Sequence, residues 1–222
     1  MKKIGLITIG QSPRDDVIAD IGPLFSPDIT LLQAGALDGL TAQDIAAFAP
    51  APGDYVLISR LRDGSSAVFA EKYILPRLQN CIDLLEEQGA ELILFLCTGS
   101  FPSFSSGVPL VFPCKVLDGI VPALSNHSSI AVVTPTPEQE AQCTEKWQNY
   151  VDSVLVVPAS PYGDPKELEL ACERIAGTPA DLVVLDCIGY TAAMKNYVRE
   201  RTGKPVILSR TIAARVVMEL LA

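Results

Sequence analysis

Histidine is almost absent from the sequence, which has 222 residues and a single histidine, His127. Six cysteines are present, but no two of them form a C-x-x-C pair. Structural zinc sites are built from closely spaced cysteine and histidine ligands, so this inventory argues against a zinc site and we expect no metal. His127 lies in the polar segment 126–128 and is expected on the surface rather than in a catalytic site.

Long apolar runs are absent as well, and none approaches the roughly 18 residues that a membrane-spanning helix needs. Residues 4–9 form an apolar run after Lys2 and Lys3. This run is too short for the core of a signal peptide, and no small-residue cleavage site follows it. We therefore expect a cytoplasmic protein without a membrane partner, whose cysteines are reduced thiols. The cysteines are Cys81, Cys97, Cys114, Cys143, Cys172 and Cys187.

Basic residues are in the minority, because 17 Lys and Arg stand against 26 Asp and Glu and give a net charge of −9. Binding to a phosphate backbone needs clustered Lys and Arg, so we expect no nucleic-acid partner. Hydrophobic residues make up 49% of the chain and charged residues 19%, which is typical of a packed globular protein rather than a disordered one. The length allows one large domain or two small ones.

Short continuous apolar runs alternate with longer amphipathic stretches along the chain. The runs lack polar alternation, as do strands covered on both faces, and strands that alternate with helices indicate a mostly parallel sheet. The expected strands are 4–9, 29–33, 55–59, 92–96, 110–112, 130–133, 154–157, 182–185 and 206–208. The expected helices are 14–24, 41–49, 71–88, 116–125, 137–149, 165–176, 191–202 and 210–221. A turn signal at 62–65 is compatible with a small hairpin.

The chain contains an internal repeat. Residues 90–99 read AELILFLCTG and residues 180–189 read ADLVVLDCIG, so each has Ala, an acid, a mainly apolar run, Cys, one residue and Gly. Two further pairs match more loosely and in the same order. They are 3–10 with 129–136, and 108–114 with 204–210.

These matches predict an α/β fold of two pseudo-symmetric flavodoxin-like lobes with parallel sheets and an active-site cleft between them. The N-terminal lobe is expected to span 1–115 and the C-terminal lobe 116–209. The closing helix, 210–222, is expected to return to the N-terminal lobe and complete it. No Gly/Ser-rich linker marks the boundary.

Ligands of open parallel α/β sheets bind beyond the carboxyl ends of the strands. The segments that follow the expected strands carry small hydroxyl, amide and glycine residues together with two of the cysteines. Asp186 also lies there, and either a structural or a catalytic role is open to it. The residues expected to bind substrate are Gln11, Ser12, Arg60, Thr98, Gly99, Ser100, Thr134, Thr136, Gly189, Tyr190 and Ser209.

Cys97 and Cys187 occupy equivalent positions in the repeat, so both thiols would approach one cleft if the lobes face each other. The helix expected after each cysteine would lower the pKa of its thiol and bind anions through free backbone N–H groups. A thiolate on one side of a bound carboxylate and a thiol on the other can remove and return a proton at carbon. The other four cysteines fall on helix faces or a loop and are expected to be inert.

The sequence resembles AroM-type proteins, which belong to the wider aspartate/glutamate/hydantoin racemase superfamily. The resemblance runs along the whole chain through LITIGQSPRDD, GAELILFLCTGSF, LVVLDCIGY and LSRTIAARVVMELL. It implies a racemase-like fold and cofactor-independent chemistry with Cys97 and Cys187 as opposed acid and base. It also implies that Thr98 helps to hold a substrate carboxylate. Ser12, Thr134 and Thr136 would then lie near the carboxylate or an amino group.

Two departures separate the chain from amino-acid racemases of that superfamily. Thr98 follows Cys97 directly, where an Asn usually intervenes, and residues 188–190 read IGY where glutamate racemases carry a Thr-His pair soon after the second cysteine. LDCIGY is nearer to the Cys-x-Gly pattern of hydantoin racemases. CTGS is similar to the maleate isomerase and arylmalonate decarboxylase branch. The resemblance therefore implies a site but no substrate.

Three functions stay open from the sequence. The first is a racemase or epimerase that acts next to a carboxylate or a hydantoin carbonyl, with a cysteine on each face. The second is an isomerase or decarboxylase of a small diacid, in which one cysteine acts as nucleophile or as lone proton donor. The third is a protein that binds a small carboxylate without using the thiols. All three imply a small anionic metabolite as partner, and a homodimer is compatible with each.

Overall fold

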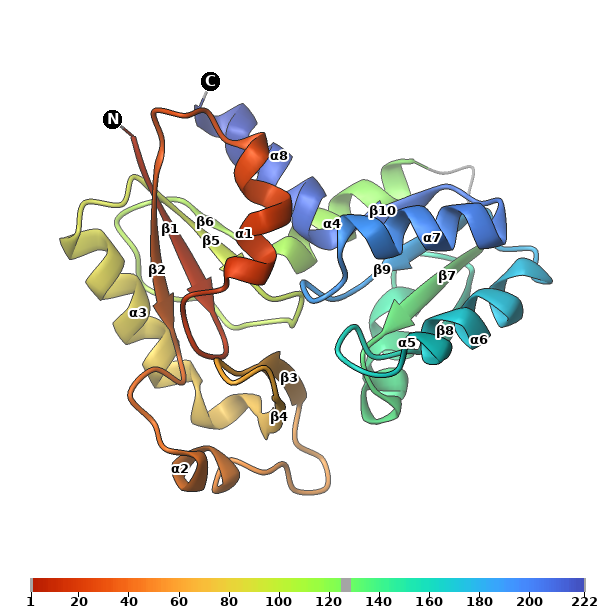
Figure 1. Ribbon diagram of the computed structural model, residues 1–222, viewed down its shortest axis with the longest axis horizontal. Helices are drawn as coiled ribbons and strands as arrows, with labels where there is room; N and C mark the ends of the chain where they lie inside the picture. The colour runs from red at the N-terminus through yellow and green to blue at the C-terminus, as the bar shows by residue number, and fades with distance from the viewer. Residues whose placement is uncertain (1, 125–128, 222) are drawn as a thin grey trace.

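Two four-stranded parallel sheets form the centre of the protein in the computed structural model, which describes residues 2–124 and 129–221 (Figure 1). The expectation for His127 falls outside these residues. The first sheet has the order β2-β1-β5-β6 and the second the order β10-β9-β7-β8. The strands of the first sheet are β1 (Lys3–Thr8), β2 (Thr30–Gly35), β5 (Leu92–Leu96) and β6 (Leu110–Val111). Those of the second are β7 (Ser129–Thr134), β8 (Ser153–Pro158), β9 (Leu182–Leu185) and β10 (Val206–Leu208).

The two sheets have the same topology. Read in reverse, the second sheet is β8-β7-β9-β10, so each of its strands corresponds to one of the first sheet in the order β2-β1-β5-β6. The three sequence matches fall on the pairs β1 and β7, β5 and β9, and β6 and β10. The predicted α/β fold with two parallel-sheet lobes is therefore confirmed. We call the sheet β2-β1-β5-β6 with its helices the first lobe, and the sheet β10-β9-β7-β8 with its helices the second lobe.

Helices connect the strands and cover the sheets with periodic apolar faces. In α6, Asp164 accepts a hydrogen bond from the Lys166 N–H as the N-cap, and the buried Leu168, Ala171, Cys172 and Ile175 follow at helical spacing. No helix of the described part of the chain has the length and apolarity to cross a membrane. The α-helices are α1 (Asp15–Ile21), α2 (Ala42–Ala46), α3 (Leu75–Glu87), α4 (Pro113–Ala123), α5 (Glu140–Gln148), α6 (Pro165–Ala176), α7 (Ala192–Thr202) and α8 (Ser209–Leu221). The 3-10 helices are η1 (Gly22–Leu24), η2 (Glu71–Tyr73) and η3 (Pro137–Gln139).

The expectation of a buried parallel strand at 55–59 is wrong. Residues Val56–Arg60 form β3, which pairs antiparallel with β4 (Ser66–Ala70) in a separate two-stranded hairpin. Burial alternates along β3, since Leu57 and Ser59 are buried while their neighbours are partly exposed. A strand covered on one face only has this period of two. The turn signal at 62–65 joins the two strands, so the hairpin expected there is present.

The last helix of each lobe packs into the core of the other. α4 follows β6, yet its Leu117 and Val121 belong to a core with Ile130 and Trp147 of the second lobe. α8 follows β10, yet its Ala213, Ala214 and Val217 belong to a core with β1 and α1 of the first lobe, and Figure 1 shows α8 beside α1. The expected boundaries at 115 and 209 stay predictions.

Candidate active site

The two cysteines of the repeat occupy matching positions at the ends of matching strands. Cys97 directly follows β5, and Cys187 follows β9 after one intervening residue. Each sulfur accepts a hydrogen bond from the backbone N–H of the glycine two residues ahead, at 3.3 Å from Gly99 N to Cys97 Sγ and at 3.3 Å from Gly189 N to Cys187 Sγ. The repeat therefore extends from the sequence to individual hydrogen bonds.

Neither thiol lies at a helix N-terminus, so that part of the prediction is wrong. The chain after Cys97 is a loop that leads to β6, and the next helix, α4, begins at Pro113. After Cys187 a turn intervenes before Thr191, whose hydroxyl caps α7 by accepting from the Met194 N–H. The largest influence on both thiols is burial, which raises the pKa of Cys97 and of Cys187 instead of lowering it.

The two thiols differ in how readily they ionise. Burial raises the pKa of Cys187 to about 11, and the Gly189 N–H and the charges of Arg14 and Arg210 act against that rise. Burial raises the pKa of Cys97 more strongly, and negative charge on Cys187 would raise it further. Cys97 is 8% exposed, whereas Cys187 is more open. Cys187 is therefore the first of the pair to become a thiolate, and its charge holds Cys97 in the thiol form.

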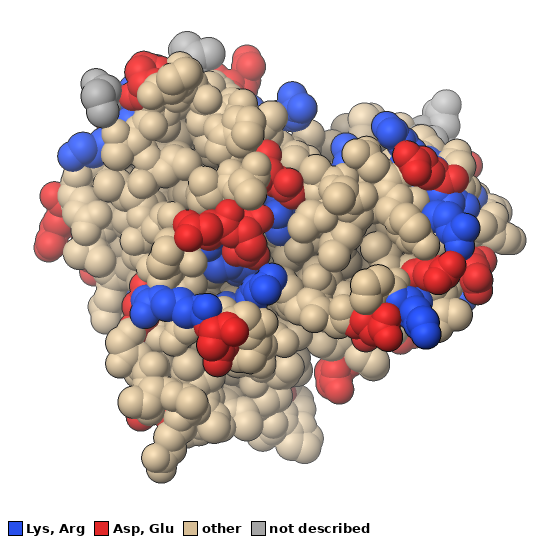
Figure 2. All heavy atoms as spheres, in the orientation of Figure 1, with Lys and Arg blue, Asp and Glu red and all other residues tan. Residues whose placement is uncertain are grey.

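Both cysteines line one cavity, to which both lobes and the hairpin contribute residues. Within it, the positions open to the centre of a water molecule span about 50 Å³. Thr98 Oγ1 donates to the carbonyl of Asp186 at 3.0 Å and so joins the two strand ends across the cavity. Figure 2 shows charged side chains of both signs gathered on the same face of the molecule as α1 and the β3–β4 hairpin.

Four of the residues predicted to bind substrate line this cavity, namely Thr98, Gly99, Thr134 and Gly189. The structure does not place the other seven in its lining. They are Gln11, Ser12, Arg60, Ser100, Thr136, Tyr190 and Ser209.

Three of these seven contact Asp38, Arg62 and Tyr162 instead. Ser12 donates its hydroxyl to Asp38 at 2.5 Å, which fixes the loop after β1. Gln11 Oε1 accepts from the Arg62 N–H of the hairpin turn at 3.0 Å. The Arg60 guanidinium lies over the Tyr162 ring, 5.9 Å from its centroid.

Ser100 donates its backbone N–H at 3.2 Å to the hydroxyl of Tyr55, which lines the cavity. The Thr136 hydroxyl is buried without a hydrogen-bond partner among the described residues.

Tyr190 and Ser209 lie beneath the Cys187 turn, and their placement corrects the prediction that they face a ligand. Both side chains are fully buried. The Tyr190 hydroxyl donates to the Ala159 carbonyl at 2.6 Å, and the Ser209 hydroxyl donates to the Cys187 carbonyl at 2.8 Å. Their hydroxyls therefore hold the backbone that carries the thiol.

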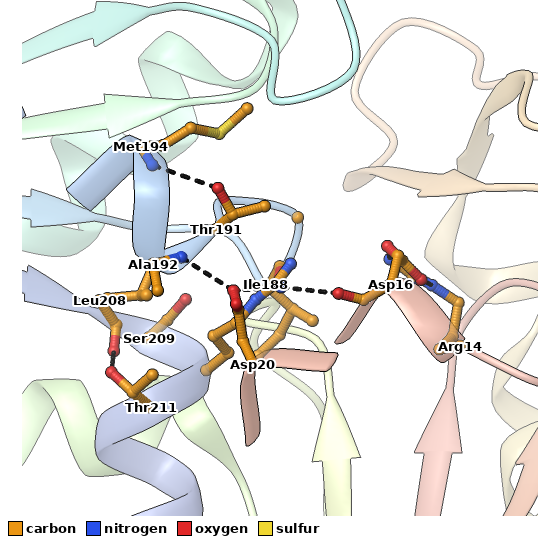
Figure 3. Close-up of polar contacts among 12 residues, drawn as sticks. Arg14, Asp16, Asp20, Ile188, Thr191, Ala192, Met194, Leu208, Ser209 and Thr211 are labelled. Atoms are coloured by element: carbon orange, nitrogen blue, oxygen red, sulfur yellow. Dashed lines mark hydrogen bonds and ion pairs between the residues drawn. The ribbon is translucent and has the colours of Figure 1, made fainter. Parts of the chain in front are cut away.

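Arg210 of α8 clamps the same turn to the first lobe. Its buried guanidinium donates from Nε to the Ile188 carbonyl at 2.8 Å, and from Nη1 to the Asp16 carbonyl at 3.0 Å and to Asp20 Oδ2 at 2.9 Å. Asp20 also accepts from the Ala192 N–H at 2.8 Å, so this α1 carboxylate reaches the first turn of α7 (Figure 3). A buried guanidinium is stabilised only when such partners offset its desolvation.

Two cations in the lining, the buried Arg14 and the partly buried Lys146, were not predicted. Arg14 donates from Nε and Nη2 to the carboxylate of Asp16, at 2.8 Å for each bond, and from Nη2 to the Tyr162 hydroxyl at 3.3 Å. Lys146 of α5 lies 3.3 Å from Asp186 Oδ2 and 3.4 Å from Asp118 Oδ1. Burial acts to lower the pKa of Lys146, but these two carboxylates outweigh it and raise that pKa, so the ammonium stays charged.

The sequence gives only weak signals that Arg14 and Lys146 line a cavity. Arg14 precedes two aspartates in the loop after a strand, which is a position where a ligand-binding residue is common. Lys146 lies in the middle of a predicted helix, and its carboxylate partners are distant in sequence. Among the described residues, no group of three or more His, Cys, Asp or Glu is placed to hold a metal ion.

Solved structures of several enzymes share this fold across the whole chain. Allantoin racemase from Klebsiella pneumoniae is similar with a TM-score of 0.70 at 15% identity, over 100% of this chain and 88% of that one. Maleate isomerase Iso from Pseudomonas putida S16 has a TM-score of 0.65 at 14% identity, over 99% of this chain and 92% of that one. Arylmalonate decarboxylase has a TM-score of 0.63 at 15% identity, over 100% of this chain and 93% of that one. What the chain shares with this racemase, this isomerase and this decarboxylase is the fold.

Sequence comparison then identifies the family. The AroM protein family matches residues 4–221, and the chain belongs to it. No curated protein is similar enough in sequence to match the chain.

Proposed function

We propose that this AroM protein is a cofactor-independent racemase or epimerase of a small carboxylate or hydantoin-type substrate, and that Cys97 and Cys187 exchange the proton at the reacting carbon. The observation that carries the proposal is the pair of thiols from matching strand ends that line one cavity, each with a glycine N–H on its sulfur. Proton transfer to both faces of one carbon needs two such groups.

The lower pKa of Cys187 makes its thiolate the base in one direction. The thiolate takes the proton from carbon and becomes a thiol, and the electron pair of the broken C–H bond moves into the adjacent carbonyl. The Cys97 thiol then gives its proton to the opposite face and becomes the thiolate. The carbon is inverted, no atom is gained or lost, and the reverse reaction starts from the Cys97 thiolate.

The two cations of the cavity lining support an anionic substrate. Arg14 and Lys146 line the same cavity as the thiols, and positive charge in a site shielded from water stabilises the negative charge that develops on the carbonyl oxygen. Thr98 and Thr134 add hydroxyl groups near the strand ends. Because the reaction requires free thiols, a reducing compartment suits it, and we place the activity in the cytoplasm.

Incubation in D₂O with candidate amino acids, hydantoins and hydroxy acids tests the reaction. Deuterium should enter the reacting position while the optical rotation decays. Cys97→Ser and Cys187→Ser should each abolish inversion, and each should still exchange one enantiomer through the remaining thiol. Cys172→Ala is the matched control, because Cys172 lies on the buried face of α6 and outside the cavity lining. Absence of both exchange and turnover across the panel would refute the proposal.

A second enzymatic function is favoured by the inequality of the two thiols in burial and in pKa. A decarboxylase or isomerase of a small diacid needs one cysteine as proton donor or nucleophile. In that case one serine substitution should abolish turnover while the other leaves most of it. The racemase requires both losses to be severe, so the same two variants separate the two reactions.

A further inference from the structure

The turn that carries Cys187 is held by the first two residues of α8. The Ser209 hydroxyl donates to the Cys187 carbonyl at 2.8 Å, and Arg210 Nε donates to the following carbonyl, that of Ile188, at 2.8 Å. The Ile188 side chain is buried in the first-lobe core together with apolar residues of α1 and α8. The turn follows a strand of the second lobe, yet it is fastened to the first lobe directly after the thiol.

Asp20 of α1 completes this attachment. Its Oδ2 accepts from Arg210 Nη1 at 2.9 Å, and it accepts at 2.8 Å from the N–H of Ala192 in the first turn of α7 (Figure 3). The Arg210 side chain is fully buried, so it cannot exchange these partners for water, and a shift of the turn would break charge-assisted hydrogen bonds. We call Ser209, Arg210 and Asp20 the Cys187 clamp.

The clamp has no counterpart at the other thiol. The repeat aligns the first two residues of α4 with the first two residues of α8. Pro113 stands in place of Ser209, and Cys114 stands in place of Arg210. Proline has no side-chain donor, and a thiol is only a weak one. Helix α4 therefore cannot hold the turn of the first lobe's thiol in the way that α8 holds the turn of the second.

Charge differs at the same pair of positions. Burial raises the pKa of Cys97 and of Cys187, and the Arg210 charge acts against that rise at Cys187. Negative charge on Cys114 would instead add to the rise at Cys97. The two thiols thus differ both in attachment and in the charge beside them.

We propose that Arg210 and Asp20 are positioning residues for Cys187 and not for Cys97. They fix the direction from which the Cys187 sulfur meets the reacting carbon. The inference rests on the proposed function, because that function makes Cys187 the first base. A reacting group displaced by about 1 Å can lose about 100-fold in rate, so the clamp should act on the chemical step rather than on substrate binding.

Amide hydrogen exchange, followed by NMR on the full chain without a ligand, tests the attachment. The Gly189 N–H and the Gly99 N–H each donate to the sulfur of their own cysteine, and both glycines are buried. Gly99 is therefore the internal control. Arg210→Lys and Asp20→Ala should each raise the exchange rate at Gly189 about tenfold or more, and that at Gly99 less than about twofold. Equal acceleration at both glycines, or none at either, would overturn the proposal.

The variants separate positioning from charge and from general loosening. Arg210→Lys keeps the positive charge but loses the fork of donors. Asp20→Ala removes the acceptor shared by Arg210 and Ala192. The Asp20 carboxylate is partly exposed, so this variant decides the test if Arg210→Lys does not fold. Arg201→Lys is the matched control, because Arg201 pairs with Glu169 on the surface and its replacement should accelerate neither glycine.

Deuterium exchange in single-thiol backgrounds tests the effect on the reaction, with the panel compound that the parent protein exchanges fastest. Only Cys187 can exchange the proton in Cys97→Ser, and only Cys97 can do so in Cys187→Ser. Arg210→Lys should slow exchange about 10- to 100-fold more in the first background than in the second. The loss should appear in kcat, with KM changed less than about threefold. Equal losses in the two backgrounds, or a loss confined to KM, would refute the positioning role.

The attachment and the reaction fail separately in this design. Selective acceleration at Gly189 in a protein that exchanges no panel compound would support the clamp and refute the racemase. Inversion of a panel compound, together with equal exchange rates at Gly189 and Gly99 in every variant, would do the reverse.

Discussion

Cys187 should react with a small disulfide reagent before Cys97 does, and more slowly than an ordinary thiol. At about pH 8 an ordinary thiol with a pKa of about 8.5 is about 24% ionised. Cys187, with its pKa of about 11, is then only about 0.1% ionised, a difference of about 240-fold. The more basic thiolate is about 13-fold more nucleophilic at a Brønsted coefficient of about 0.45. The net rate should be about 20-fold below that of an unstructured peptide thiol.

The assay follows mixed-disulfide formation by peptide mass spectrometry from neutral pH to about pH 11, with a cysteine peptide as the reference. The labelling rate at Cys187 should rise about tenfold per pH unit until its pKa is reached. Arg14→Met should slow labelling at Cys187, because the Arg14 charge lowers the pKa of that thiol. Labelling of Cys97 first, or half-ionisation of Cys187 below about pH 9, would contradict the assignment of Cys187 as the first base.

Three further predictions concern stability. Gly189→Ala should destabilise the fold by about 1–3 kcal/mol in urea unfolding, because the added Cβ would lie 2.5 Å from the Tyr162 hydroxyl oxygen. The control is Gly177→Ala, whose Cβ would meet no atom within 4 Å and which should be neutral or stabilising. Arg210→Met should lower the free energy of unfolding by about 3–5 kcal/mol and increase hydrogen exchange around Ile188. Arg201→Met removes an ion pair with Glu169 whose side chains are 47% and 45% exposed, and it should lower the free energy of unfolding by less than about 1 kcal/mol. Stability should fall as pH rises from 9 to about 11, because burial raises the pKa of thiols such as Cys114 from 9.0 to about 11 and the unfolded chain releases those protons first. Cys114→Ala should flatten that fall, and a slope equal to the parent's would contradict the reasoning.

Much of the fold could be predicted because the repeat and the apolar runs are local features. The matched segments around Cys97 and Cys187 contain both the buried strand and the glycine that donates to sulfur, so sequence spacing alone pairs the two thiols. The hairpin strand at Val56–Arg60 could not be recognised as such. Its apolar residues form a short run whose alternation becomes visible only when burial is known.

The cavity wall could be predicted only in part, because strand ends mark backbone positions and not side-chain directions. Thr98 and Thr134 follow strands and line the cavity. Tyr190 also follows a strand, yet its ring turns into the core toward Ala159. Gln139 and Lys146 reach the cavity from η3 and α5, and their roles depend on partners far away in sequence. Pairings of that kind follow from how the lobes pack.

The exchange of α4 and α8 determines how the chain can be divided. A fragment that ended at Ala123 would carry Leu117 and Val121 away from their core, and its own sheet would lose the cover of Val217. Each fragment alone would expose an apolar face, so only the two together would fold.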